Sequence, residues 1–463
     1  MKHFDAIIIG AGQAGVPLAK KLALAGKKTA LIEKRLVGGT CINDGCTPTK
    51  AMVASAKMAH MARKSSELGV ETGKVKVDFK KIIQRKSEIV NQFRGSTEKG
   101  IENTSGLTLF MGEARFSAEK ELTISMADGG EEVLMLSGDL IFINTGAQTA
   151  VPVIEGLNES GYLTSTSIME LNKLPEHLVV VGGNYIGLEF GQMFSRFGSK
   201  VTILEKSERI LSKEDKDVSE MLTDILMEEQ IDVLRASEIR KITNYKKEGL
   251  DIEVKTGRRV KHLKASHILI AAGRIPQTAN LGLENCGVKT DEKGYVVVNK
   301  KLETNVKGIY ALGDVKGGPA FTHIAYNDYT IVYRNLIEGA NYSIADRPLP
   351  YCMFTDPQLG RIGLSETEAK AQKLDYQVAI LPMTSVARGI ETNETKGMMK
   401  AVVDVKTKKI LGASILASEG GEIMSVLQMA MEGGITYDRI RYCVFAHPTY
   451  SESLNNLFMK LDD

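Results

Sequence analysis

Residues 6–15 read AIIIGAGQAG, a short apolar run that leads directly into three glycines. This pattern is typical of a buried strand that turns tightly into a helix and binds a dinucleotide on the turn. The first glycine permits the turn, the second lets the backbone approach a pyrophosphate, and the third lets the helix pack closely on the strand. The first unpaired N–H groups of the helix would then face the phosphates. We therefore predict that Gly10, Gly12 and Gly15 bind a dinucleotide.

The same pattern returns 172 residues further along the chain, where residues 178–187 read LVVVGGNYIG. In both copies a second apolar run ends in a glutamate, Glu33 or Glu205, 23 residues after the first glycine. A carboxylate at this place accepts hydrogen bonds from the hydroxyls of an adenosine ribose. The repeat predicts two Rossmann-like domains built on buried parallel strands. It adds Gly182, Gly187 and Glu205 to the predicted binding residues.

The second copy differs from the first at Asn184, which stands where the second glycine belongs. Asparagine tolerates unusual backbone angles, but it adds a side chain where a phosphate would approach. We still predict a second dinucleotide here rather than a structural turn. Glu205 favours a free ribose 2′-hydroxyl and repels a 2′-phosphate, so NADH is preferred. Lys206 and Arg209 lie close enough in sequence to leave NADPH open.

The later part of the chain contains further strand patterns. HILIAAGRIP (267–276) and IYALGDV (309–315) are predicted buried strands, each closed by a glycine turn. From about residue 348 the character changes, because MKAVVDV (399–405) and ILGASILAS (410–418) resemble antiparallel strands and residues 423–432 form a helical pattern. We place domain boundaries near residues 150, 275 and 347. The predicted fold class is α/β, with two Rossmann-like domains and a C-terminal α+β domain.

Composition excludes several classes of protein. A length of 463 residues exceeds what one hydrophobic core usually supports. A net charge of +2, with no dense Lys/Arg stripe, argues against nucleic acid as a partner. No stretch approaches the roughly 18 apolar residues of a membrane span, and no export signal is recognised. Five cysteines are too few, and odd in number, for a secreted disulfide framework. We expect a cytoplasmic protein without membrane contact.

Two cysteines lie close together in GGTCINDGCTPTK (38–50), directly before a segment with helical spacing (51–66). With four residues between them, Cys41 and Cys46 can close a small disulfide ring, and a helix dipole would lower a thiol pKa. Two unrelated thiols, or half of a metal site, are the alternatives. Zinc would need further ligands, and the other cysteines are isolated. We predict a redox-active pair and no metal site.

A second candidate for chemistry stands near the C-terminus, in HPTYSE (447–452). A histidine with a carboxylate partner can hold a thiol deprotonated and later protonate a leaving group, because its pKa lies near neutrality. The residue types alone favour a structural histidine, since His447 is one of seven.

Together these segments resemble, over essentially the full chain, the class I flavoprotein pyridine nucleotide-disulfide oxidoreductases, which include dihydrolipoyl dehydrogenase, glutathione reductase and mercuric reductase. GGTCINDGCTPTK matches their redox-active segment and HPTYSE matches their acid–base motif. The resemblance implies that Cys41 is the thiol that faces substrate and Cys46 the thiol beside the flavin. It implies that His447 moves protons and that Glu452 orients it.

The resemblance also implies FAD and NAD(P)H as cofactors, a homodimer whose dyad reaches the other subunit's cysteines, and three domains. These are an FAD domain (1–150 and 276–346), an NAD(P) domain (151–275) and a dimerisation domain (347–463). The residues implied to contact FAD, beyond the first glycine turn, are Glu33, Thr40, Lys50, Thr145, Gly146, Asp314, Ala320, Phe321, Thr322 and His323. Those implied to line the nicotinamide pocket, beyond the second turn, are Tyr185, Glu189 and Gly273.

The segments NTGAQT, GGPAFTHIAYNDYTIV, TKGMMKAVVD and HPTYSESLNNLF look most like those of bacterial reductases that confer resistance to reactive chlorine species. Members of that group reduce hypothiocyanous acid, and copper(II) reduction has been associated with them. Typical mercuric reductases carry a C-terminal pair of cysteines that NNLFMKLDD lacks, so efficient Hg(II) reduction is not expected. We expect a small oxidised substrate, hypothiocyanous acid first. Lipoamide, glutathione disulfide, a metal ion, or slow cycling as a flavin redox sensor are the alternatives.

Two further features receive structural interpretations, and a third has none. Cys443 is expected in the core, because free cysteines are usually buried. The charged run 207–216 is expected to form a solvated loop and helix entry. Asp44 stands in the redox segment where the related proteins usually have an apolar residue, and the sequence offers no reason for it.

Overall fold

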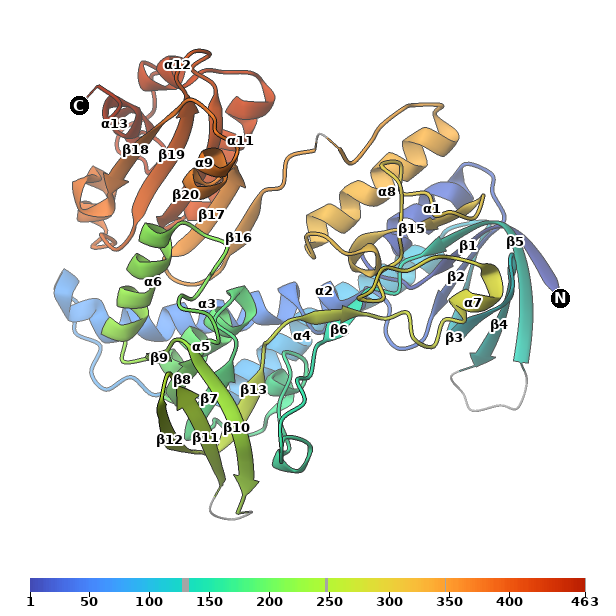
Figure 1. Cartoon of the computed structure of the whole chain (residues 1–463), viewed down its shortest axis with the longest axis horizontal. Coiled ribbons are helices and arrows are strands. Elements are labelled where there is room, and N and C mark those ends of the chain that lie inside the picture. The colour runs from blue at the N-terminus through green and yellow to red at the C-terminus, as the bar shows by residue number, and fades with distance from the viewer. Residues whose placement is uncertain (127–132, 246–248, 346, 463) are drawn as a thin grey trace. The chain divides into compact units, whose positions relative to one another are not determined.

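The computed structural model describes residues 1–126, 133–245, 249–345 and 347–462. The chain divides into two compact units, coloured along the chain in Figure 1. The first unit comprises Met1–Ala51, Gln84–Ala150 and Gly273–Arg347. The second comprises Met52–Ile83, Val151–Ala272 and Pro348–Asp463. The boundaries fall inside two helices, α3 (Cys46–Lys64) and α4 (Phe79–Glu102), so each helix contributes residues to both units.

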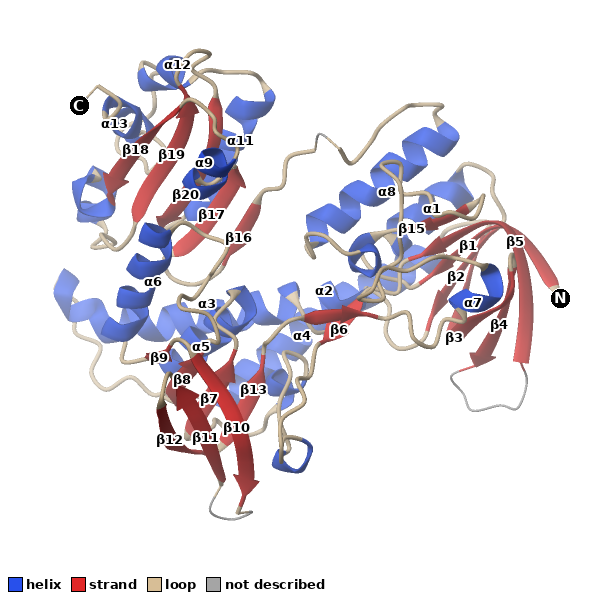
Figure 2. Ribbon diagram, viewed as in Figure 1, coloured by secondary structure: helices blue, strands red, loops and turns tan. Residues whose placement is uncertain are grey.

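The first unit is built on a mixed sheet (Figure 2). Its strands are β1 (Lys2–Ile9), β2 (Thr29–Glu33), β3 (Leu107–Ala118), β4 (Glu121–Met126), β5 (Val133–Ile143) and β15 (Ile309–Ala311). β1 pairs in parallel with β2 and β5, β2 with β3, and β5 with β15. β4 pairs antiparallel with β3 and β5, so these two long strands belong both to the parallel layer and to an antiparallel meander. The remaining elements are β6 (Ala147–Thr149), β14 (Arg274–Pro276), α1 (Gly15–Leu24), α2 (Gly39–Asn43), α7 (Leu283–Cys286), α8 (Thr322–Ile337) and a 3-10 turn at Gly313–Lys316.

β1 lies at the centre of this unit because both of its faces are covered. Ala6 and Ile8 pack with residues of α1 and α8, whereas Ile7 and Ile9 pack with residues of the meander such as Phe116. The four β1 side chains are at most 4% exposed. A run of consecutive apolar residues, rather than an alternating one, is what a parallel strand buried on both faces requires.

The second unit contains three sheets. A parallel sheet has the order β13-β7-β8-β9, an antiparallel one β10-β11-β12, and a second antiparallel one β16-β17-β20-β19-β18. The strands are β7 (His177–Val181), β8 (Lys200–Leu204), β9 (Asp232–Leu234), β10 (Ser237–Asn244), β11 (Leu250–Thr256), β12 (Arg259–Ala265), β13 (His267–Ile270), β16 (Tyr351–Met353), β17 (Gln358–Gly363), β18 (Tyr376–Pro382), β19 (Met398–Asp404) and β20 (Ile410–Ala417). The helices are α5 (Tyr185–Phe197), α6 (Lys216–Glu228), α9 (Glu366–Ala371), α10 (Ala387–Glu391), α11 (Gly420–Glu432), α12 (Tyr437–Arg441) and α13 (Ser453–Met459), with 3-10 turns at Ser65–Leu68, Asn158–Ser160, Ser167–Glu170 and Met383–Ser385.

The α/β fold class predicted from the sequence is confirmed. Both glycine-turn copies follow buried parallel strands, and the segments at 399–405 and 410–418 form the antiparallel pair β19 and β20. The predicted helix at 423–432 is α11, which begins three residues earlier, at Gly420. The compact units do not separate 151–275 from 347–463, so the three domain boundaries stay a prediction.

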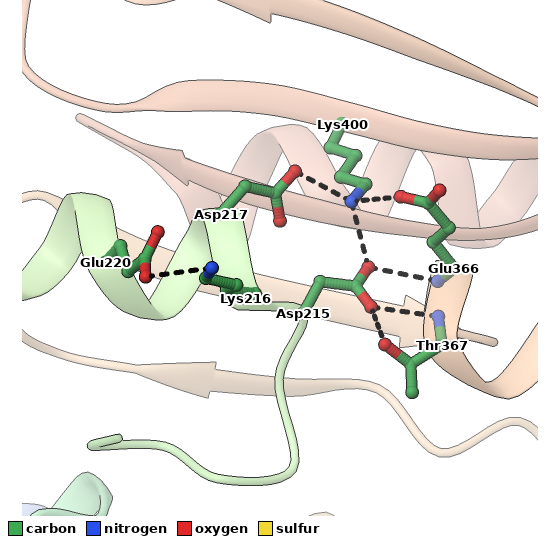
Figure 3. A pocket seen from close by; sticks show the side chains of 7 residues that line it. All are labelled: Asp215, Lys216, Asp217, Glu220, Glu366, Thr367 and Lys400. Atoms are coloured by element: carbon green, nitrogen blue, oxygen red, sulfur yellow. Dashed lines mark hydrogen bonds and ion pairs between the residues drawn. The ribbon is translucent and has the colours of Figure 1, made fainter. Parts of the chain in front are cut away.

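The charged run 207–216 is a loop that enters α6, as expected, but it is not solvated along its whole length. Within it Glu214 and Asp215 are each about 4% exposed or less. The Asp215 carboxylate accepts hydrogen bonds from the backbone N–H groups of Glu366 and Thr367 at 3.0 and 2.9 Å, and from Thr367 Oγ1 at 2.7 Å (Figure 3). These N–H groups belong to the first turn of α9, which has no partners for them within the helix. Asp215 therefore caps a helix whose first residue is 151 residues away in sequence.

Lys400, on β19, completes this cluster from the other side (Figure 3). Its ammonium group lies 3.1 Å from Asp215, 2.8 Å from Asp217 and 2.7 Å from Glu366, and its side chain is only 3% exposed. The groups line a pocket of about 330 Å³. Because charges without partners are costly to bury, a cluster like this one ties the start of α6 firmly to the C-terminal sheet.

We expect the substitution Asp215→Asn to lower the stability of this unit. Burial alone would raise the pKa of Asp215, but the hydrogen bonds from Thr367 and Glu366 and the charge of Lys400 lower it to about 2. Relative to an unfolded carboxyl near 4, this corresponds to about 2 kcal/mol of stability at pH 7. The contribution is present above the unfolded pKa and is lost as the pH falls from about 4 toward 2.

Urea unfolding followed by circular dichroism at pH 7 and at pH 3 measures this effect. Glu220→Gln is the matched control, because Glu220 lines the same pocket but is 46% exposed and makes a single surface ion pair with Lys216. We expect the control to change stability by less than about 0.5 kcal/mol. Equal midpoints for the two variants at pH 7 would contradict the capping role of Asp215.

Candidate active site

The first glycine turn is fixed partly by the chain itself. Gly10 has a φ of +107°, and a Cβ there would lie 2.3 Å from the carbonyl oxygen of Asn144. A Cβ on Gly15 would lie 2.0 Å from the carbonyl oxygen of Gly10. Gly12 is different, because a Cβ there would meet only the Asn144 side chain, at 3.4 Å. The fold therefore requires Gly10 and Gly15, whereas the absence of a side chain at Gly12 leaves space outside the turn.

The two glutamates hold their turns in the same way. Glu33 accepts hydrogen bonds from the N–H of Ala11 and the N–H of Arg35, both at 2.9 Å. Glu205 accepts from the N–H groups of the equivalent residues, both at 2.7 Å, and these are Gly183 and Ser207. Each of these positions is separated from its counterpart by the same 172 residues. The two copies of the sequence repeat therefore share the same hydrogen bonds between the glutamate and the backbone.

The second turn shows what Asn184 does. The backbone requirements are kept, since a Cβ on Gly187 would lie 1.9 Å from the carbonyl oxygen of Gly182. Asn184 is the N-cap of α5, and its side-chain oxygen accepts a hydrogen bond from the N–H of Tyr185 at 2.8 Å. The N-cap of α1 is Ala14, which has no side-chain acceptor. One first-turn N–H of α5 is therefore satisfied internally, and no side chain does the same for α1.

Both cysteines of the redox segment are in the reduced, thiol form. Cys41 lies in α2 and Cys46 is the first residue of α3, which begins five residues before the predicted segment. The positive end of a 19-residue helix therefore acts on Cys46, where it favours a thiolate. Cys46 Sγ lies 3.3 Å from Oγ1 of Thr322, at the start of α8. The structure thus brings Thr322 to the cysteine pair from a segment far along the chain.

The two thiols are not equivalent. The hydrogen bond with Cys46, followed by burial, raises the pKa of Cys41, while Thr322 and Lys50 act in the opposite direction. The protonated form is therefore favoured at Cys41, whereas the helix start favours a thiolate at Cys46. This arrangement means that a base is needed before Cys41 can act as a nucleophile.

Several residues predicted to contact FAD have properties that fit a bound flavin nucleotide. Thr145 Oγ1 is buried and has no hydrogen-bond partner in the described part of the chain. Gly146 follows with a φ of +72° and open space at its Cβ position. Burial raises the pKa of Asp314, against the charges of Arg274 and Lys316. A buried hydroxyl, a glycine with open space at its Cβ position and a partly buried carboxyl are suited to the polar groups of a ribityl-phosphate chain.

The other predicted residues lie as follows. Thr40 belongs to α2, and its carbonyl oxygen accepts the N–H of Asp44 at 2.9 Å. Ala320 precedes Phe321, the N-cap of α8, whose ring stacks on that of His323 with 5.4 Å between centroids. In the second unit Glu189 is 5% exposed and accepts the N–H of Phe354 at 2.8 Å. Tyr185 is half-buried, and Gly273 has a φ of +134°.

The predicted dyad is formed. Nδ1 of His447 lies 2.9 Å from Oε2 and 3.1 Å from Oε1 of Glu452. Donation from Nδ1–H to the carboxylate leaves Nε2 available to accept a proton. The histidine side chain is 68% exposed in the single chain. The dyad belongs to the second unit and the cysteines to the first.

Sequence reasoning missed or misplaced three residues near these groups. Cys443 was expected in the core, but it is exposed. Asn144 was not singled out, although its side-chain amide donates to the carbonyl oxygen of Gly10 at 3.0 Å and so braces the first turn. Arg35 was also missed, and it forms an ion pair with Asp44. The NTGA motif was a usable signal for Asn144; nothing local indicates the other two.

Comparison with known proteins agrees with this geometry. The sequence pattern described as pyridine nucleotide-disulphide oxidoreductase matches residues 4–328, and that of the dimerisation domain of the same family matches residues 349–458. The chain belongs to the pyridine nucleotide-disulphide oxidoreductase family. The resemblance stated from the sequence is therefore confirmed.

Relatives of this oxidoreductase include a probable pyridine nucleotide-disulfide oxidoreductase, RclA, of Escherichia coli (strain K12), which is 39% identical over 99% of both chains. A mercuric reductase of Staphylococcus aureus is 34% identical over 99% of this chain and 82% of its own length. The structure described as the Cu(II) complex of HOCl-induced flavoprotein disulfide reductase RclA from E. coli superposes with a TM-score of 0.90 over 99% of both chains, at 39% identity.

These matches make the chain an oxidoreductase of a family that uses a flavin and a pyridine nucleotide. The match to the dimerisation domain supports the predicted homodimer. In the described part of the chain, no helix has both the length and the apolar character needed to cross a membrane.

We expect Gly12→Ala and Gly15→Ala to fail in different ways. Gly15→Ala places a methyl group against the Gly10 carbonyl, so it should lower stability by about 1–3 kcal/mol. Gly12→Ala should leave the stability of the FAD-free protein unchanged but reduce the bound FAD, because its methyl group occupies the space outside the turn. Urea unfolding and the ratio of flavin to protein absorbance measure the two effects. Full FAD content in Gly12→Ala would show that no phosphate approaches this turn.

Proposed function

We propose that this oxidoreductase transfers electrons from NAD(P)H to a small oxidised substrate through Cys41 and Cys46, and that the substrate is hypothiocyanous acid. The observation that carries the proposal is the asymmetric thiol pair, with Cys46 at the start of α3 beside Thr322. Such a pair is suited to thiol–disulfide chemistry, since one thiolate is stabilised while its partner holds a proton.

The choice of substrate rests on the relatives. The E. coli relative is described as HOCl-induced, which connects it with reactive chlorine species. Four segments of this chain resemble the reactive-chlorine-resistance reductases, among them GGPAFTHIAYNDYTIV, which contains Thr322. A small neutral oxidant also needs no dedicated pocket, in contrast to a peptide disulfide or a lipoyl group.

The chemistry assigned to the cysteines balances. Cys41 thiolate attacks the sulfur of hypothiocyanous acid, an S–S bond forms, and the hydroxyl group leaves as water after taking up a proton. Cys46 then attacks the sulfur of Cys41 and displaces thiocyanate, which leaves a Cys41–Cys46 disulfide. The two thiols lose two electrons and the oxidant gains two. FAD, when bound, supplies the electron pair from NAD(P)H that returns the disulfide to thiols.

His447 supplies the proton chemistry in this proposal. Because Cys41 holds its proton within the pair, the first attack needs a base, and Nε2 of a histidine oriented by Glu452 is suited to that task. The family resemblance assigns this dyad to the partner subunit's active site. A homodimer with shared active sites follows from that assignment.

The cofactor sites are proposed on the same grounds. The first glycine turn, with Thr145, Gly146 and Asp314, would hold FAD. The second turn, with Tyr185, Glu189 and Gly273, would hold the nicotinamide nucleotide.

Copper(II) is a second candidate substrate. It is favoured by the solved Cu(II) complexes of the E. coli relative. Thiolates are soft ligands that suit Cu(I), so the cysteine pair would suit the product of Cu(II) reduction.

Steady-state oxidation of NADH by the purified protein tests the substrate. We expect rapid consumption with hypothiocyanous acid and slow consumption with lipoamide, glutathione disulfide and Hg(II). Cys41→Ser should lose turnover at least about 10³-fold while retaining FAD, because the nucleophile is removed. The exposed thiol of Cys443 provides the matched control, Cys443→Ser, which should turn over at the rate of the unmodified protein.

The outcomes separate the candidates. Turnover with lipoamide but not with hypothiocyanous acid would overturn the assignment of hypothiocyanous acid as the substrate. Turnover with Cu(II) alone would favour the metal-ion reductase. Negligible rates with every oxidant would indicate a slowly cycling redox sensor instead.

We expect NADH to be preferred over NADPH by about tenfold or more in kcat/KM, because the carboxylate of Glu205 repels a 2′-phosphate. Glu205→Gln should narrow the ratio by raising kcat/KM for NADPH. Glu208→Gln is the control, since Glu208 is an exposed acid three residues further along. If the wild-type protein has the same kcat/KM for NADPH as for NADH, Glu205 does not determine the choice of coenzyme.

A further inference from the structure

The turn between the two cysteines carries a charged residue that the proposed mechanism does not use. Asp44 lies two residues before Cys46 and three after Cys41. Its carboxylate pairs with both terminal nitrogens of Arg35, and the contact from Nη1 measures 3.3 Å. The Asp44 side chain is 12% exposed, so the carboxylate is mostly withdrawn from water. A two-point contact of this kind fixes orientation as well as charge.

Arg35 is itself held by the nucleotide turn. Its backbone N–H donates to Oε1 of Glu33, whose other oxygen accepts the N–H of Ala11. The hydrogen bond and charge of Asp44, together with the charge of Glu33, raise the pKa of Arg35 above its usual value. Glu33, Arg35 and Asp44 therefore form a continuous path from the predicted adenosine site to the turn between the cysteines.

The same turn is fixed on its other side by Asn43. The Asn43 amide donates to the carbonyl oxygens of Val37 and Gly39, both at 3.0 Å, and Arg94 donates to its oxygen at 3.1 Å. These contacts hold the backbone of the turn without charge on the turn itself. The ion pair of Asp44 thus adds an electrostatic effect to a turn that is already anchored.

The internal repeat provides a control for the role of Arg35. Ser207 occupies the equivalent position in the second copy and makes the same backbone hydrogen bond to Glu205. No cysteine pair follows that copy. The glycine unit therefore does not need an arginine side chain at this position, and the guanidinium is found in the copy that precedes the cysteines.

We propose that Arg35 is a positioning residue of the redox centre, which orients the turn between the cysteines through Asp44 and neutralises the carboxylate that this turn carries. The inference rests on the proposed function, because it concerns the thiolate which that function requires. A carboxylate without its partner would disfavour the thiolate of Cys46 by like-charge repulsion. The family's usual apolar residue at this position needs no such partner.

Titration of the thiolate tests the inference. The ultraviolet absorbance of the thiolate in the reduced holoenzyme, and the long-wavelength band of a flavin next to a thiolate, are followed against pH. We expect Arg35→Gln to raise the apparent thiolate pKa by about one unit. Arg35→Gln combined with Asp44→Asn should return it to the wild-type value, because the repulsion is then absent. Arg35→Lys keeps the positive charge but cannot make the two-point contact with the carboxylate. It should shift the apparent thiolate pKa less than Arg35→Gln does.

Arg115→Gln is the matched control, since Arg115 forms an exposed ion pair with Glu284 in the same unit, at 3.1 Å. It should leave the thiolate titration unchanged. An unchanged titration in Arg35→Gln, or a shift that Asp44→Asn does not reverse, would overturn the proposal. Flavin content is measured in parallel, and a variant that loses FAD is titrated against FAD-free wild type.

The two proposals fail separately. Wild-type protein that turns over none of the oxidants would refute the proposed function, whereas the titration needs no substrate. A reversible pKa shift would then still support Arg35. Normal turnover together with an unshifted titration would refute the role of Arg35 alone.

Discussion

The hydrogen bonds of Glu33 connect the strand β2 to the glycine turn that follows β1. The proposed phosphate-binding turn and the proposed role of Arg35 both depend on this connection. It holds the turn in the shape that a phosphate would meet, and it sets the backbone from which Arg35 reaches the cysteines. Glu205 makes the same bonds in the second unit. One carboxylate per unit thus fixes a backbone frame, and the side chains placed on that frame differ between the copies.

Much of the fold could be read from the sequence, because the deciding patterns are local. Four consecutive apolar residues before a glycine turn predict a strand covered on both faces, and β1 and β7 are such strands. The sequence pattern predicts a helical segment from residue 51, whereas α3 begins at Cys46 and contains Pro48 in its first turn. Proline is in fact tolerated in the first turn of a helix, where its missing N–H has no partner to lose. Cys46 is therefore inside the helix rather than before it.

The errors concern contacts between distant parts of the chain. Nothing near Asp215 in sequence indicates that it caps a helix at residue 366, so a charged run was taken for a solvated one. Even over nine residues, the pairing of Asp44 with Arg35 depends on how the chain folds, and the local pattern does not indicate it. The cysteine pair could be predicted from its own spacing, whereas the dyad was recognised through family resemblance, because residue types alone favour a structural histidine. Local sequence patterns predict helices and strands, whereas the pairing of charged side chains depends on the tertiary structure.

The cap on α5 makes the two glycine turns different as partners for a phosphate. This difference bears on how long a nucleotide would remain bound at each of the two proposed sites. At α1 the N-cap residue has no side-chain acceptor, so no cap competes with a phosphate for a first-turn N–H, although Val16 and Leu18 already donate to backbone oxygens. At α5 the amide oxygen of Asn184 already satisfies the N–H of Tyr185, so a phosphate gains less there. A prosthetic group must remain through many cycles, and a coenzyme must leave after each one. In the proposed assignment, Asn184 would thus suit the second turn to a coenzyme that leaves, and its absence would suit the first turn to a cofactor that stays bound.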